Sequence, residues 1–186
     1  MVWHYCGDSE ATLSAPDSRD WSTVANLRCT AKLLKRLKEK PLADPQPAEN
    51  RLGDWYANVL NIGYNRLVLV TNERSLLCLV VPMKDSARLR ERIRERAHAL
   101  LHDLGIPADL AAAEVRRMER MPFAKTANRS VLASMNDFAF HARGFFEGDD
   151  EDVYLHELEL YLAGIPSGAL DYATPAEEAR RLFGLH

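Results

Sequence analysis

Two apolar runs separated by a short polar stretch form the strongest pattern in the chain. Residues 66–82 read RLVLVTNERSLLCLVVP, in which β-rich apolar runs flank the polar stretch TNERS. This arrangement is typical of a β-hairpin. Each run is continuously apolar rather than strictly alternating, so we expect both faces of the strands to be covered, which requires helices on at least one side.

Helical periodicity dominates most of the remaining chain. Apolar stripes with charged residues between them predict helices, and capping residues, glycines or prolines mark their ends. Together with the hairpin, they predict an α+β fold: an antiparallel sheet built around the 66–82 hairpin with helices packed on it. The predicted helices cover residues 30–40, 86–105, 108–113, a segment after residue 130, about 152–163 and the segment from Thr174. At Thr174 the sequence TPAE predicts a capping box. A further strand is predicted within 115–123.

Length and composition favour a single folded domain. The chain has 186 residues, of which 47% are hydrophobic and 27% charged, and these are ordinary values for one globular domain. Residues 1–25 lack any sustained period and contain glycine, proline and serine. We therefore expect an N-terminal tail or extension over 1–25 and a single α+β domain over 26–186.

The charge of the chain is modest in total and uneven along its length. The formal net charge is -3 and the pI is about 6.1, so the whole molecule has no electrostatic bias toward nucleic acid or anionic membranes. Basic residues gather at 31–40 and 87–96, and acidic residues gather at 147–159. A nucleic-acid partner must therefore use a local patch. The arginines of 87–96 are candidate phosphate contacts, but glutamates interleave with them, which favours a solvent-exposed face with intrahelical ion pairs.

Cysteine usage and hydropathy indicate the compartment. Cys6, Cys29 and Cys78 are scattered and odd in number, and no secretory apolar region precedes them, so we expect free thiols in a reducing, cytoplasmic environment. The longest apolar run, at 76–82, is far shorter than the roughly 20 residues that a membrane-spanning helix needs. No membrane partner is predicted.

The segment from Lys125 to Ser130 has the residue types of an anion-binding loop. Two cations and several hydrogen-bonding side chains come just before a helix N-terminus, where free N–H groups and the helix dipole favour a phosphate. The alternative is simple helix capping by Thr126, Asn128 or Ser130 with exposed cations. The candidate ligand-binding residues are Lys125, Thr126, Asn128, Arg129, Ser130 and Asn136.

The helix that follows carries a serine, an aspartate and a histidine on one face. Ser134, Asp137 and His141 invite a nucleophile-and-base interpretation. Side chains spaced three and four apart on one helix project in parallel, however, whereas a catalytic triad usually converges from different elements. The alternative is a solvated face with an Asp–His contact.

Four segments in order resemble a widespread bacterial family described only as a domain of unknown function. They are RCTAKLLKRL at 28–37, LGDWYANVL at 52–60, RLVLVTNERSLLCLVVP at 66–82 and KTANRSVLASMNDFAF at 125–140. The resemblance implies a small cytosolic bacterial protein with a mixed fold, and it carries no established activity or cofactor. Its motifs mark Asp54 and Trp55, Asn72 and Glu73, and the stretch from Thr126 to Asp137.

Three functions follow as hypotheses. The first is a non-enzymatic binding or regulatory factor that contacts a phosphate group of nucleic acid or nucleotide through the 125–130 loop. The second is a metal-dependent hydrolase or nuclease in which Asp54, Glu73, Asp137 and His141 converge. The third is a protein-interaction module, a homo-oligomer or one half of a two-protein system that uses Phe140. We predict no cofactor and no metal site, because HALLH at 98–102 lacks the glutamate of a zinc-protease motif.

Overall fold

Within the part of the chain that the structure describes, a five-stranded sheet carries six α-helices. The computed structural model describes residues 25–146 and 155–185. The predicted N-terminal extension, apart from its last residue, and the acidic stretch at 147–152 lie outside these ranges. The strands are β1 (Leu27–Cys29), β2 (Trp55–Ile62), β3 (Asn65–Asn72), β4 (Cys78–Pro82) and β5 (Phe123–Lys125). The helices are α1 (Ala31–Leu37), α2 (Leu89–Asp103), α3 (Ala108–Arg117), α4 (Arg129–Phe145), α5 (Leu155–Ala163) and α6 (Pro175–Leu182), with 3-10 helices η1 (Met83–Arg88) and η2 (Gly168–Leu170).

The sheet has the strand order β4-β3-β2-β1-β5. The predicted hairpin is confirmed, because β3 pairs antiparallel with β4 and Val70 lies opposite Leu79. Strand β2 extends the sheet antiparallel to β3. Strand β1 then pairs parallel with both β2 and β5.

The sheet is therefore mixed, and the prediction of an antiparallel sheet is correct only for β2, β3 and β4. Strand β1 has three residues with the polar Arg28 at its centre, which is too short for a periodic signal. Its parallel partners are separated from it along the chain by α1 and by α2 and α3, as parallel pairing requires a crossover. These long-range pairings leave no mark in the local pattern.

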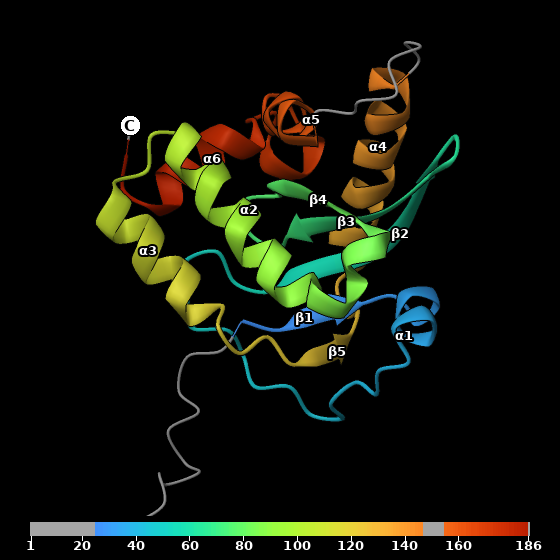
Figure 1. Ribbon diagram of the computed structural model, residues 1–186. Coiled ribbons are helices and arrows are strands. Elements are labelled where there is room, and N and C mark those ends of the chain that lie inside the picture. Colours follow the sequence, from blue (N-terminus) through green and yellow to red (C-terminus); the bar gives the residue numbers. More distant parts are fainter. Residues whose placement is uncertain (1–24, 147–154, 186) are drawn as a thin grey trace, which may run out of the picture.

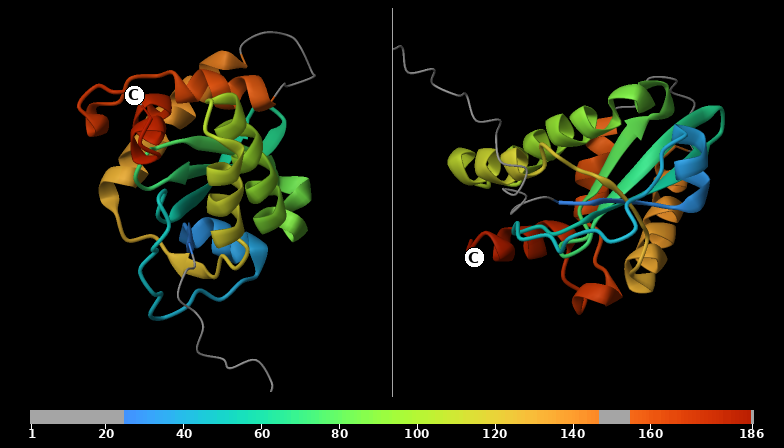
Figure 2. Two further views of the ribbon diagram at one scale, coloured as in Figure 1. Left: turned by 90° about the vertical axis from the view of Figure 1, so that its left-hand side faces the viewer. Right: turned by 90° about the horizontal axis from the view of Figure 1, so that it is seen from below.

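Helices cover both faces of the sheet, as the continuous apolar runs predict. Trp55 and Val70 belong to the core on the side of α2, α3 and α6. Tyr56 and Leu69 point to the other side, where α4 and α5 supply the apolar contacts. Figure 1 shows α2 in front of the strands and α3 to their left, and the view from below in Figure 2 shows the sheet between α2 and α4.

Local capping signals place the helix ends correctly in several cases. The Thr30 side chain accepts a hydrogen bond from the Leu33 N–H at the start of α1. At the start of α6, Thr174 and Glu177 form the reciprocal capping box that TPAE predicts. Helix α2 begins later than residue 86, since η1 occupies residues 83–88 first. No described helix is long and apolar enough to cross a membrane.

Helix α5 closes the open edge of β4 with a buried carboxylate. Glu159 is fully buried, and its Oε1 accepts a hydrogen bond from the Val80 N–H at 2.7 Å. The same oxygen lies 2.5 Å from Nε of Arg96 on α2. His156 is placed between Glu159, at 3.5 Å, and Asp103 on α2, at 2.5 Å. An edge N–H that would otherwise be exposed is thereby paired, and α2 is tied to α5.

Candidate functional site

A polar cluster lies on the α4 side of the sheet, next to the start of that helix. The Tyr56 hydroxyl donates to Glu73 at 3.3 Å and accepts from the Asn128 N–H at 3.2 Å. Burial, followed by the charge of Glu73, raises the pKa of Tyr56 to about 12. The phenol therefore stays protonated at neutral pH and joins the β2–β3 pair to the loop before α4. It is neither a base nor a nucleophile in this setting.

Asp54 and Arg28 form the second half of this cluster. Asp54 Oδ2 lies 2.5 Å from Arg28 Nε, and Oδ1 accepts from the Asn26 backbone and side-chain N–H groups at 2.8 and 2.9 Å. Arg28 Nη1 also donates to the Lys125 carbonyl at 3.2 Å. Asp54 is almost fully buried, and these bonds use both of its oxygens. Its role is to join β1, β2 and β5.

Asn128 is the N-cap of α4, as the capping alternative predicts. Its side-chain oxygen accepts from the N–H groups of Ser130 and Val131 at 2.9 and 3.4 Å. The Asn128 backbone N–H donates a hydrogen bond to the Tyr56 hydroxyl. A helix N-terminus attracts anions through unsatisfied N–H groups, and here two of the first three are already paired. An anion therefore gains little from this helix end.

We expect Asn128→Ala to lower the free energy of unfolding by about 1 kcal/mol, because it removes the N-cap acceptor of α4. Urea denaturation followed by circular dichroism measures this loss. Asn136→Ala is the matched control, since Asn136 is exposed within the same helix and alanine is the better helix former, so its effect should stay within about 0.5 kcal/mol. Equal losses in the two variants would contradict the capping role of Asn128.

The remaining residues of the predicted binding loop do not converge on one point. Lys125 is opposite Cys29 in the β1–β5 register, so its side chain lies on the sheet face away from Arg28 and Tyr56. Thr126 is partly buried, whereas Arg129, Ser130 and Asn136 are exposed on α4. The structure thus separates Lys125 from the helix start.

The four residues of the hydrolase hypothesis fall into two separate groups. Asp54 and Glu73 belong to the Tyr56 cluster, and the Glu73 N–H donates to the Asp54 carbonyl at 2.9 Å. Asp137 and His141 line a different pocket, of about 240 Å³, between α4 and residues 165–168. Ser134 also lines that pocket, but among the described residues no hydrogen bond joins it to Asp137 or His141. In the same part of the chain, no group of three or more acidic, histidine or cysteine side chains is placed to hold a metal ion.

The arginines from Arg88, at the end of η1, to Arg96 of α2 divide into two lines. Those on the line through Arg88 are paired with carboxylates, and two of these pairs, made with Glu91 and Glu95, confirm the ion pairs predicted within this segment. On the neighbouring line, Arg90 and Arg94 make no ion pair with any carboxylate in the described ranges. The paired side chains are Arg88 with Glu91 at 2.6 Å, Arg92 with Glu95 at 2.8 Å, and Arg96 with Glu159 of α5 at 2.5 Å.

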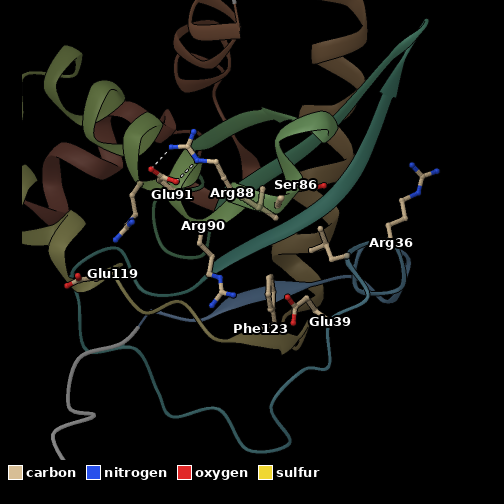
Figure 3. A pocket seen from close by; sticks show the side chains of 12 residues that line it. Arg36, Glu39, Ser86, Arg88, Arg90, Glu91, Glu119 and Phe123 are labelled. Atoms are coloured by element: carbon tan, nitrogen blue, oxygen red, sulfur yellow. Dashed lines mark hydrogen bonds and ion pairs between the residues drawn. The ribbon is translucent and has the colours of Figure 1, made fainter. Parts of the chain in front are cut away.

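The unpaired arginines line a cleft of about 510 Å³ between α1, β5 and the start of α2 (Figure 3). Its cations outnumber its carboxylates by four to three, although the chain as a whole is acidic. We call it the arginine cleft. Its polar and charged lining residues are Arg36, Glu39, Ser86, Arg88, Arg90, Glu91, Arg94 and Glu119.

An arginine stacked on an aromatic ring forms one wall of the arginine cleft. The Arg90 guanidinium carbon lies 4.7 Å from the centre of the Phe123 ring, and Figure 3 shows Glu39 beside that ring. This cation–π contact holds a flexible side chain in place. Lys125 lies two residues further along the same strand face as Phe123, about 6.6 Å away at the usual rise per residue. It therefore adds a fifth cation near the cleft.

The described cysteines are buried thiols without a partner cysteine. Cys29 and Cys78 are both free and buried, and burial raises the pKa of each thiol to about 12. Neither supplies a thiolate at neutral pH. Cys6 lies outside the described residues.

The sequence favours a solvent-exposed face for the arginines of 87–96, Arg90 among them, and the candidate site residues do not include Arg28, Tyr56 or Phe123. Arg28 and Tyr56 stand within two of the family-like motifs, and a polar residue inside a short strand was the available signal. Arg90 and Phe123 are 33 positions apart, and no local pattern connects them. For Arg90, the available signal was the residue three positions further along the helix. This residue is Ile93 rather than a glutamate, so Arg90 has no ion-pair partner at that spacing.

Comparison with known proteins gives the family of this chain. A search of curated proteins and a search of solved structures each found no significant match. A family model described as a domain of unknown function, DUF6933, matches residues 26–178. This range contains all five strands and the first five helices, and it includes the four motifs that carry the resemblance. The chain therefore belongs to the DUF6933 family of domains of unknown function.

Proposed function

We propose that this protein is a non-enzymatic binding factor that holds a phosphate-bearing ligand in the arginine cleft. The observation that carries the proposal is the division of the α2 arginines. Arg88, Arg92 and Arg96 have carboxylate partners, whereas the cleft-facing Arg90 and Arg94 have none among the described residues. Cations without a carboxylate partner are available to a phosphate.

Guanidinium groups suit this task because they donate paired hydrogen bonds to phosphate oxygens. Arg36 stands on α1 across the cleft from Glu119 of the segment after α3 (Figure 3). Arg94 is only partly exposed, so its charge is less screened than that of a fully solvated side chain. A phosphate between α1 and α2 would therefore meet cations from two elements.

Of the predicted loop, only Lys125 lies near this ligand position, which is separate from the start of α4. Asn128 already caps that helix end. The Tyr56 cluster offers no free catalytic base, because Tyr56 stays protonated and both oxygens of Asp54 are bonded to Arg28 and Asn26.

The test is binding of a short fluorescein-labelled DNA strand at low salt, measured by fluorescence anisotropy. In Arg36→Gln/Arg94→Gln, the association constant should fall about tenfold or more, because two guanidinium groups no longer bind phosphates. The slope of log K against log salt should also become shallower by about 0.7 for each phosphate that the variant fails to neutralise.

Arg92→Gln/Arg129→Gln is the matched control. It removes the same charge, but Arg92 is bonded to Glu95 and Arg129 lies at the start of α4. Its association constant and salt slope should stay close to the wild-type values. If both double variants weaken binding equally, the effect comes from net charge and the arginine cleft is not the site.

A further inference from the structure

The arginine cleft continues along α2 as an open trough. A second depression, of about 760 Å³, is formed by α2 and α3 and shares Glu91, Arg94 and Glu119 with the cleft. It adds Glu95, His98, Val115 and Arg116 to the lining. We call the combined depression the α2 trough. From Arg90 to His98 it follows the helix for about 12 Å at 1.5 Å per residue.

This length is greater than one phosphate site needs. In a stacked nucleic-acid strand the rise per nucleotide is about 3.4 Å, so the α2 trough has room for more than one nucleotide. Its cations come at intervals, with Arg36 at one end, Arg90 and Arg94 along the helix, and Arg116 at the other end. Spaced cations along an open groove are typical of sites that follow a sugar-phosphate backbone.

The Arg90–Phe123 pair provides a flat surface in the same trough. Phe123 is 8% exposed, and the exposed Arg90 guanidinium covers its ring at 4.7 Å. The outer face of the guanidinium is a plane on which an unpaired base can stack. A phosphate without a base has no planar group that could stack on it.

The carboxylates of the trough distinguish a nucleic acid from an acidic peptide. Glu39, Glu91, Glu95 and Glu119 line the trough, and they repel the carboxylates of a peptide and the phosphates of a strand alike. Exposed bases offset this repulsion because their amino groups donate hydrogen bonds to carboxylates, while arginines contact phosphates or guanine acceptors; an oligoglutamate side chain has no such donor. Mixed charge around a stacking plane therefore favours a strand with exposed bases.

We propose that the α2 trough binds single-stranded nucleic acid, with one base stacked on the Arg90 guanidinium and the backbone phosphates along Arg36 and Arg94. This inference rests on the proposed function, since the same cations hold the phosphates. It adds the ligand class and assigns Arg90 to base contact.

The experiment compares a labelled DNA strand with an abasic strand of the same length, in wild type and in Arg90→Lys. Wild type should bind the strand with bases about tenfold more tightly, because stacking adds to the phosphate contacts. Arg90→Lys keeps the charge and loses the plane, so this ratio should fall close to one while binding of the abasic strand stays unchanged. Arg94→Lys is the matched control, and it should leave the ratio as in wild type.

Each other outcome decides against a specific statement. If wild type binds both strands equally, or if Arg90→Lys leaves the ratio intact, base stacking is wrong and phosphate binding in the arginine cleft stands. If neither strand binds, the proposed function falls as well. A labelled oligoglutamate that binds as tightly as the DNA would overturn the inference in favour of an acidic peptide.

Discussion

Arg96→Met is expected to lower the free energy of unfolding by about 3–5 kcal/mol at neutral pH, because it leaves a buried carboxylate without its cation. Glu159 is fully buried, and Arg96 lies 2.5 Å from it. After the substitution the carboxylate keeps the Val80 N–H and the longer contact to His156. Neither replaces the charge of a guanidinium. Urea denaturation followed by circular dichroism measures the loss.

The loss should depend on pH in a defined direction. Burial raises the pKa of Glu159 above its ordinary value, and Arg96 is the largest influence that lowers it. Removing Arg96 therefore raises this pKa further. A carboxyl with a raised folded-state pKa costs stability as pH rises above its unfolded value of about 4.3. The deficit of the variant should thus be smallest in mild acid and should grow toward pH 8.

Two further variants separate this ion pair from general effects. Arg92→Met changes the same residue type on the same helix, but Arg92 bonds to the exposed Glu95, so it should cost at most about 1 kcal/mol. Arg96→Met/Glu159→Gln removes both charges and keeps an oxygen for the Val80 N–H, so it should recover most of the loss. A loss in Arg96→Met no greater than in Arg92→Met would show that the buried pair is not important for folding.

The parts of the fold that follow local rules could be predicted from the sequence. The hairpin follows from two apolar runs around TNERS, and the TPAE capping box needs only the side chains of Thr174 and Glu177. Strands β1 and β2 were missed for a physical reason. Arg28 and Asn58 interrupt their apolar pattern, and these polar groups are tolerated because Asp54 and Thr30 pair with them. Such compensation becomes visible only when distant segments are brought together.

The same division applies to the candidate site. Asn128 follows a local capping rule and lies where that rule places it. The stack of Arg90 on Phe123 joins α2 to β5, and neither segment alone indicates it. Whether an arginine of α2 is paired also depends on other elements. Arg96, for example, forms its ion pair with Glu159 of α5 and not with a residue of its own helix. Charge patterns along one helix therefore predict ion pairs better than they predict unpaired cations.

Asp54→Ala is expected to lower the free energy of unfolding by about 3–5 kcal/mol, comparable with the loss in Arg96→Met. The substitution leaves the mostly buried Arg28 without its carboxylate. It also leaves the buried Asn26 N–H without an acceptor, and a buried unpaired donor costs about 1–3 kcal/mol by itself. Because these groups join β1 to β2, the parallel half of the sheet should loosen first.

The Asp54 variants also decide whether the family-like motif LGDWYANVL marks a structural or a catalytic carboxylate. Asp44→Ala is the control for stability, since Asp44 is exposed in the loop before β2 and should change the unfolding free energy by less than about 0.5 kcal/mol. Asp54→Asn keeps the shape and one acceptor, so it should lose less stability than Asp54→Ala. Hydrogen exchange should then show faster opening of β1 and β5 than of β3 and β4, because only the first two depend on the Asp54 bonds. Uniform protection across all five strands in Asp54→Ala, with unchanged stability, would remove the structural role and make Asp54 a catalytic candidate again.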